Sequence, residues 1–304
     1  MRVKLSGFTK TNKQRYYCKD CQKSFTYRVS SKREKRKLAW FKQWIEEGYS
    51  IRELALLKRS SKSTVRRVIN YWLSRRPKQS NDLSSVRYII CDGTFLKRTN
   101  GIYAVMNAGD HKLVRASYGI KEGVKDLLPF YIELKDDGLK PISATVDGNP
   151  QQIKYLQEVW PLIKIQRCVV HVQRQGLNWC RRNPKRTDAK HLRELLLHLT
   201  DVSTKQEAQS FIKAVYAWEK RFGSAIDSSP NRGKVFSDII RARSMLLKAL
   251  PNLFHYLDDS NVARSTNALE GYFSRLKELY RLHRGLSIKN RSNYFSWYFF
   301  LIQK

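Results

Sequence analysis

The chain has 304 residues, with 59 Lys and Arg against 26 Asp and Glu and a formal net charge of +33 at pH 7. It is 41% hydrophobic and 12% aromatic, which excludes a disordered basic tail, and its length suits one sizeable core plus a small accessory domain. No apolar run approaches the roughly 20 residues of a spanning helix, and no signal peptide is recognisable. We therefore expect no membrane partner, and a polyanion, nucleic acid above all, as the ligand.

The first 80 residues carry the densest positive charge, a net +18 from 23 Lys and Arg and 5 Asp and Glu. Within 1–30, Cys18 and Cys21 form a C-x-x-C pair of the kind that binds zinc, but a structural zinc site needs four ligands. The next cysteine is Cys91 and the first histidine is His111, so the pair does not complete such a site. The alternative is a small β-hairpin whose metal-binding half is missing, which leaves Zn²⁺ a doubtful cofactor.

Residues 31–76 have the pattern of a helix-turn-helix module. Apolar residues on one face predict a helix ending at Gly48, and Ser50 with Glu53 has the spacing of a capping box that starts the next helix. The alternative is a three-helix bundle with a solvated basic face, and a polar linker follows at 77–85. In the DNA-binding interpretation, the front of the last helix presents four side chains to DNA, those of Lys62, Ser63, Arg66 and Arg67.

From residue 86 the pattern changes to strands and helices that alternate. Strands are expected at 86–95, 101–109, 112–120, 140–150 and 163–172, and helices at 124–138 and 151–161. Three strands in a meander, followed by helix, strand, helix and strand, predict a mixed α/β sheet in the RNase H-like order. In that order the first strand lies centrally and the fourth strand runs beside it.

Two acids follow apolar runs in this region, Asp92 after the first strand and Asp147 after the fourth. The expected strand order brings them close together at adjacent strand ends. Two carboxylates held close repel each other, and a shared divalent cation such as Mg²⁺ relieves the repulsion. For each acid alone the alternative is a turn-forming residue, since both precede Gly.

After residue 171 the sequence becomes helical, with 3.6-residue periodicity at 189–200, 205–223, 234–250 and 263–287. In the last of these segments Glu270 lies beside an apolar stripe and is the candidate third acid. Asn267 and Glu270 also have the N-cap and N3 spacing of a capping box, so helix capping is the alternative to metal binding.

The ordered set of motifs resembles the DDE transposases of the Mutator-like superfamily, which include bacterial insertion-sequence enzymes with an RNase H-like catalytic domain. The motifs are Asp92 in CDGTF, Asp147 in TVDGNP, Cys168 and His171 in RCVVH, and Glu270 in STNALEGYFSRLK. The resemblance covers about residues 85–290. It implies a catalytic core at 86–180, a helical insertion at 181–263 and C-terminal catalytic helices at 264–304.

The resemblance also implies roles for these residues. Asp92, Asp147 and Glu270 correspond to a metal-binding catalytic triad that uses two Mg²⁺ or Mn²⁺ ions. Cys168 and His171 correspond to a C-x-x-H signature beside the active site, to which we assign a supporting role.

Further positions of the chain are assigned to DNA contacts. Trp218 loosely matches a tryptophan of the family's insertion domain that stacks near the cleaved DNA end, and a plain core tryptophan is the alternative. Basic residues after Glu270 are expected to hold phosphates on the outer face of their helix. These residues are Arg275, Lys277, Arg281 and Arg284.

The function implied is metal-dependent cleavage of double-stranded DNA at terminal inverted repeats and strand transfer into target DNA. Acting on two ends suggests a homodimer or larger synaptic complex, and the expected location is the cytoplasm of a prokaryote, at the nucleoid. One alternative is a non-catalytic, transposase-derived DNA-binding protein, against which the three acids argue. The other is an RNase H-fold nuclease acting on RNA or hybrids, which the helix-turn-helix pattern disfavours because protein helices read the major groove of B-form DNA.

Overall fold

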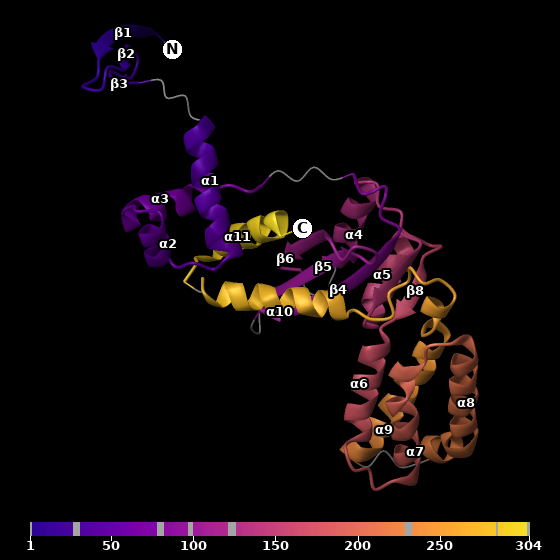
Figure 1. Ribbon diagram of the computed structural model, residues 1–304. Helices are drawn as coiled ribbons and strands as arrows, with labels where there is room; N and C mark the ends of the chain where they lie inside the picture. Colours follow the sequence, from indigo (N-terminus) through magenta and orange to yellow (C-terminus); the bar gives the residue numbers. More distant parts are fainter. Residues whose placement is uncertain are drawn as a thin grey trace. The chain divides into compact units, whose positions relative to one another are not determined.

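The structure is a computed structural model that describes residues 2–26, 31–77, 82–96, 100–120, 126–228, 233–283 and 285–302 (Figure 1). The chain divides into two compact units, Met1–Ser74 and Arg75–Lys304. Of the expected linker at 77–85, residues 78–81 lie outside the described residues, and so does the predicted DNA contact Arg284.

The first unit begins with a three-stranded antiparallel sheet, where the sequence indicated a two-stranded hairpin. Its strands, in spatial order, are β1 (Val3–Phe8), β2 (Gln14–Cys18) and β3 (Ser24–Phe25). Cys18 ends β2 and is buried, Cys21 lies in the following turn and is exposed, and both thiols are free. Backbone hydrogen bonds from Cys21 and Asp20 lower the pKa of the Cys18 thiol.

Three helices complete this unit: α1 (Ser31–Glu46), α2 (Ile51–Leu57) and α3 (Lys62–Leu73). The predicted capping box at the start of α2 is confirmed, because Ser50 Oγ accepts from Glu53 N at 3.2 Å and Glu53 Oε2 accepts from Ser50 N at 2.8 Å. α3 packs against both other helices and buries one apolar face, which includes Val65, Val68 and Ile69.

The second unit contains a five-stranded mixed sheet. Its strands are β4 (Tyr88–Leu96), β5 (Asn100–Asn107), β6 (Leu113–Tyr118), β7 (Ser143–Val146) and β8 (Lys164–Arg167). The spatial order is β6-β5-β4-β7-β8, with β4 antiparallel to β5 and parallel to β7. The first strand of the sheet is therefore central and the fourth lies beside it, as the sequence predicted.

Helices cover both faces of the sheet (Figure 1). Alternate residues of β4, including Ile89 and Cys91, enter a core shared with α4 (Leu127–Asp136) and α5 (Pro150–Val159). This alternation turns Asp92 to the opposite face, where α10 (Asn267–Arg281) packs against β4 and α11 (Ile288–Leu301) packs against β6.

One predicted strand was too long. The sequence predicted a strand over 163–172, but β8 ends at Arg167 and helix α6 (Val169–Cys180) begins directly after Cys168. The β-branched residues of the CVVHV segment read equally well as a buried strand or as the buried face of a helix. Cys168 and His171 consequently lie at the N-terminus of a helix.

The predicted helical segment between β8 and α10 packs around a core of its own. α6 contacts α7 (Thr187–Leu197) and α9 (Lys234–Ala249), and α8 (Lys205–Asp227) contacts α7 and α9. Buried side chains from all four helices form one apolar cluster. In the described residues, no helix combines the length and apolar character needed to cross a membrane.

Candidate functional site

Asp92 lies inside strand β4 rather than at its end, because β4 continues to Leu96. The parallel neighbour of β4 is β7, in which Thr145 lies opposite Ile90. Two residues further along both strands, the same register brings Asp147 level with Asp92. Asp92 is only 7% exposed, and its Oδ1 accepts a hydrogen bond from Gly93 N at 2.8 Å. Burial raises the pKa of Asp92 to about 7, and the negative charges of nearby carboxylates act in the same direction.

Asp147 lies in the turn from β7 into α5, and an arginine holds this turn. Arg167, at the end of β8, donates from its NH2 group to the Asp147 carbonyl oxygen at 3.1 Å. Gly148 has a φ of +107°, and a Cβ added there would lie 1.8 Å from that NH2 group. The Asp147 carboxylate is held as well, since its Oδ1 accepts from Asn149 N at 3.0 Å. The cation nearest this turn is thus a structural arginine.

Glu270 lies in the first turn of α10, but it caps nothing. The N-cap residue is Thr266 instead of the predicted Asn267, and it makes no side-chain capping hydrogen bond. Glu270 Oε1 lies 3.2 Å from His171 Nε2 and 3.3 Å from Arg174 NH1, both on α6. The capping alternative is therefore excluded, and the Glu270 carboxylate is directed at α6, where it meets His171 and Arg174.

Cys168 and His171 are connected to the start of α10 through Thr266. The backbone N–H of Thr266 donates to Cys168 Sγ at 3.3 Å, and Thr266 Oγ1 lies 3.2 Å from His171 Nδ1. A hydrogen bond with Cys168 and the surrounding negative charges raise the pKa of His171 to about 9. Burial alone would raise the pKa of the Cys168 thiol, but hydrogen bonds from His171 and Thr266 bring it below its usual value. The C-x-x-H pair, at the junction of β8 and α6, is thus hydrogen-bonded to the N-terminus of α10, the helix that carries Glu270.

The three predicted acids line one polar cavity of about 330 Å³, together with His171 and Lys277. Within the described ranges, no group of three His, Cys, Asp or Glu side chains is arranged as a ready-made metal site. The donor chemistry nevertheless fits Mg²⁺ or Mn²⁺, because carboxylate oxygens are the ligands these ions prefer. Burial is the main cause of the raised pKa of Asp92, and the negative charges of Asp147 and Glu270 in the same cavity add to it.

The basic residues of α10 differ in how far they are exposed. Arg275 and Arg281 are exposed, as expected for phosphate contacts. Lys277, predicted on the outer face, instead turns inward, lines the acidic cavity and donates from Nζ to Thr94 Oγ1. Lys277 follows Glu270 by seven residues, or two helical turns, so the helical period already placed both on one face.

Two other groups of predicted DNA contacts lie far from these acids in the sequence. They are four residues of α3 and Trp218 of α8. Lys62, Ser63, Arg66 and Arg67 are all exposed on one helix of the first unit. Trp218 is 5% exposed within the core of the helical segment, and its Nε1 donates to the Asp188 carbonyl oxygen at 3.0 Å. This packing describes the core tryptophan that the sequence left as the alternative.

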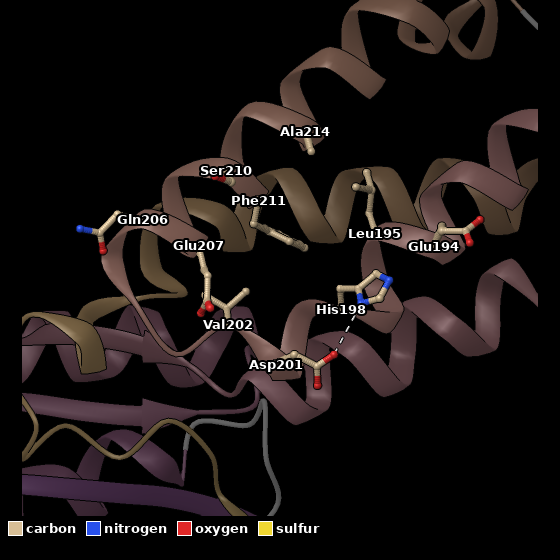
Figure 2. Close-up of a pocket in the computed structure, with 10 residues that line it drawn as sticks. All are labelled: Glu194, Leu195, His198, Asp201, Val202, Gln206, Glu207, Ser210, Phe211 and Ala214. Atoms are coloured by element: carbon tan, nitrogen blue, oxygen red, sulfur yellow. Dashed lines mark ion pairs between the residues drawn. The ribbon is translucent and has the colours of Figure 1, made fainter.

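A larger cavity, of about 540 Å³, lies in the helical segment between α7 and α8 (Figure 2). Two of its three carboxylates are already engaged: Glu207 forms the capping box of α8 with Thr204, and Asp201 lies 3.5 Å from His198. The remaining lining is largely apolar and includes Phe211, and none of the three predicted acids contributes to it. All three predicted acids converge instead on the cavity around Asp92.

Sequence reasoning missed three residues that shape the site. Arg167 holds the turn of Asp147, and Arg174 contacts Glu270. Thr266 contacts both residues of the C-x-x-H pair. Arg174 had a usable signal, since it follows His171 by three residues and lies on the same face of α6.

Comparison with known proteins gives one family. Residues 96–234 match the model of "Transposase, Mutator family", a segment that contains Asp147, Cys168 and His171 and leaves Asp92 and Glu270 outside it. No curated protein matches the chain. Over this segment, the family match confirms the resemblance to the Mutator-like transposases that the motifs indicated.

Proposed function

We propose that the chain is a DDE transposase that cleaves DNA at transposon ends and joins those ends to target DNA with the help of divalent metal ions. The observation that carries this proposal is the convergence of Asp92, Asp147 and Glu270 on one polar cavity from three separate elements. The central position of β4 and its parallel pairing with β7 support an RNase H-like catalytic core. The family match supports transposition as the biological setting.

In this proposal Asp92, Asp147 and Glu270 hold two Mg²⁺ or Mn²⁺ ions. When bound, these ions would activate the attacking water or 3′-hydroxyl and stabilise the leaving oxygen. Asp92 contributes an oxygen fixed by a central strand, and Asp147 one fixed by the turn that Arg167 holds. Glu270 joins them by giving up its contacts with His171 and Arg174, after which Arg174 is available to a DNA phosphate.

Lys277 provides the positive charge of the cavity on the side facing Thr94. A scissile phosphate brought to the acids meets this ammonium, which orients the phosphate and stabilises the charge that develops in the transition state. The protein forms no covalent intermediate in this scheme, so its contribution is positioning and electrostatics.

The three helices of the first unit are proposed to be a helix-turn-helix module that recognises the terminal inverted repeats. The exposed Lys62, Arg66 and Arg67 on α3 place three cations on one helix surface. Affinity for DNA falls as salt rises, and each phosphate neutralised by such a cation steepens the slope of log affinity against log salt concentration by about 0.9. Arg66→Ala with Arg67→Ala should therefore weaken duplex binding and reduce this slope by about 2. Two such proteins, one at each end, are proposed to form the synaptic complex.

The test is a cleavage and strand-transfer assay with DNA from the ends flanking the gene, in Mg²⁺ or Mn²⁺. Joined products are expected with the native protein and none with Asp147→Asn. Asp201→Asn is the matched control, because this acid lies in the helical segment with a side chain 72% exposed. If the native protein and Asp147→Asn bind the DNA equally and neither cuts it, the chain is a transposase-derived DNA-binding protein. Cleavage without joining would indicate a nuclease.

A further inference from the structure

A second cavity lies next to the acidic one and shares Lys277 with it. This cavity, of about 360 Å³, is lined by Phe95, Leu96, Tyr118, Lys277, Tyr280, Arg281 and Arg291. Lys277 bonds to Thr94, two residues after Asp92 on the same side of β4, so this contact separates the two cavities. The two cavities therefore lie close enough for one DNA strand to place a phosphate at the acids and a neighbouring nucleotide at the second cavity.

The lining of this second cavity combines aromatic rings with positive charge. Phe95 is 54% exposed, and the guanidinium of Arg291 lies 6.0 Å from the centre of the Tyr280 ring. Three cations and three aromatic rings line it, and none of its described lining residues is acidic. Such a surface selects a ligand that is both planar and anionic, because the rings stack on flat π-systems while Lys and Arg pair with phosphate.

The size of the cavity limits the ligand further. Its volume falls at the lower end of the range for small-molecule sites, of about 300–1,000 Å³, which admits one nucleotide and excludes a base-paired duplex. Stacking on aromatic side chains is a sequence-tolerant way to hold an unpaired base, because every base has a π-face.

We infer that this cavity holds an unpaired nucleotide at the end of the DNA strand that the acids process, with its base against Phe95 and its phosphate near Arg281. This inference rests on the proposed function, since it takes DNA as the substrate. It adds a site for single-stranded DNA to a chain whose other proposed contacts are with duplex DNA.

The test compares the binding of three probes in Ca²⁺ by native protein and Phe95→Ala. The probes are a short duplex with blunt ends and two versions of it that carry an unpaired tail, each on a different strand. Native protein is expected to prefer one tailed duplex. Phe95→Ala should bind the preferred tailed duplex about 5- to 150-fold more weakly, which is the value of one stacked base, and should bind the blunt duplex as the native protein does. Tyr216→Ala, which removes another aromatic side chain that is 57% exposed, should change neither.

Two results would overturn the inference: equal binding of all probes by the native protein, or equal weakening of all probes in Phe95→Ala. The proposed function is judged separately, by cleavage. A preference for the tail that Phe95→Ala removes, in a protein that cuts no DNA, would support the cavity's role and refute the transposase activity.

Discussion

Gly148→Ala should damage the site through the backbone while leaving every predicted acid in the sequence. Gly148 has a φ of +107°, and a non-glycine residue in such a sparsely populated conformation costs about 1–3 kcal/mol. Its new Cβ would also overlap the Arg167 guanidinium, 1.8 Å from NH2, and push it off the Asp147 carbonyl oxygen. Losing that partly buried, charged hydrogen bond costs about 1.5–3 kcal/mol more, so we expect about 2.5–6 kcal/mol in total.

Gly119→Ala is the matched control for the backbone part of this cost. Gly119 has a φ of +104°, but a Cβ there meets no atom within 4 Å, so only the strain of about 1–3 kcal/mol should appear. The two costs can be measured by hydrogen exchange, in peptides from β7 and β8 for Gly148→Ala and from β6 for Gly119→Ala. Hydrogen exchange reports the free energy of local opening, so it applies even where the two units of the chain unfold separately. Equal destabilisation by the two variants would refute the argument that Arg167 packs over the glycine.

Three further predictions concern charge and packing. The pKa of Asp92 is raised from 3.8 to about 7. Without metal, the protonated Asp92 side chain therefore stabilises the fold at low pH, and this stabilisation is lost as the pH rises through 7. The increase in melting temperature on adding Mg²⁺ should therefore grow between pH 6 and pH 8, and Asp92→Asn should abolish this growth. Arg174→Gln should tighten Mg²⁺ binding by up to about fivefold in calorimetry, because the partly exposed Arg174–Glu270 pair is worth about 0.2–1 kcal/mol. Weaker binding would instead mean that Arg174 positions Glu270 for the metal. Trp218→Phe should destabilise the helical segment by about 1–3 kcal/mol in hydrogen exchange, since the Asp188 carbonyl loses its donor, whereas an unchanged segment with weaker DNA binding would restore the stacking role.

The sheet and its two acids could be predicted from local pattern. Apolar runs separated by turn residues located β4 and β7, and the order of strands and helices was enough to place Asp147 beside Asp92. The prediction of strand ends was weaker, since β4 continues past Asp92 to Leu96 and β8 ends at Arg167. These ends depend on which neighbour pairs with each residue, and that information is not local.

The surroundings of Glu270 could not be predicted from local pattern. Its capping-box spacing with Asn267 was genuine, but contacts from His171 and Arg174, 99 and 96 residues earlier in the chain, direct its carboxylate elsewhere. Tertiary contacts of this kind override a local signal that is worth about 1 kcal/mol. The family resemblance supplied the role of Glu270, and the structure supplies the partners that compete for it.

The segment that returns to the sheet has a consequence for how the protein is made. Thr145 Oγ1 donates to the carbonyl oxygen of Ala263, and Val169 N donates to that of Arg264 at 3.1 Å, so the chain rejoins the sheet only after the whole helical segment. Contacts between residues so distant in sequence form late, and during synthesis they wait for the later residue to leave the ribosome. A nascent or truncated chain that stops before Glu270 would thus present two acids without the third. Such a fragment is expected to bind DNA without cutting it.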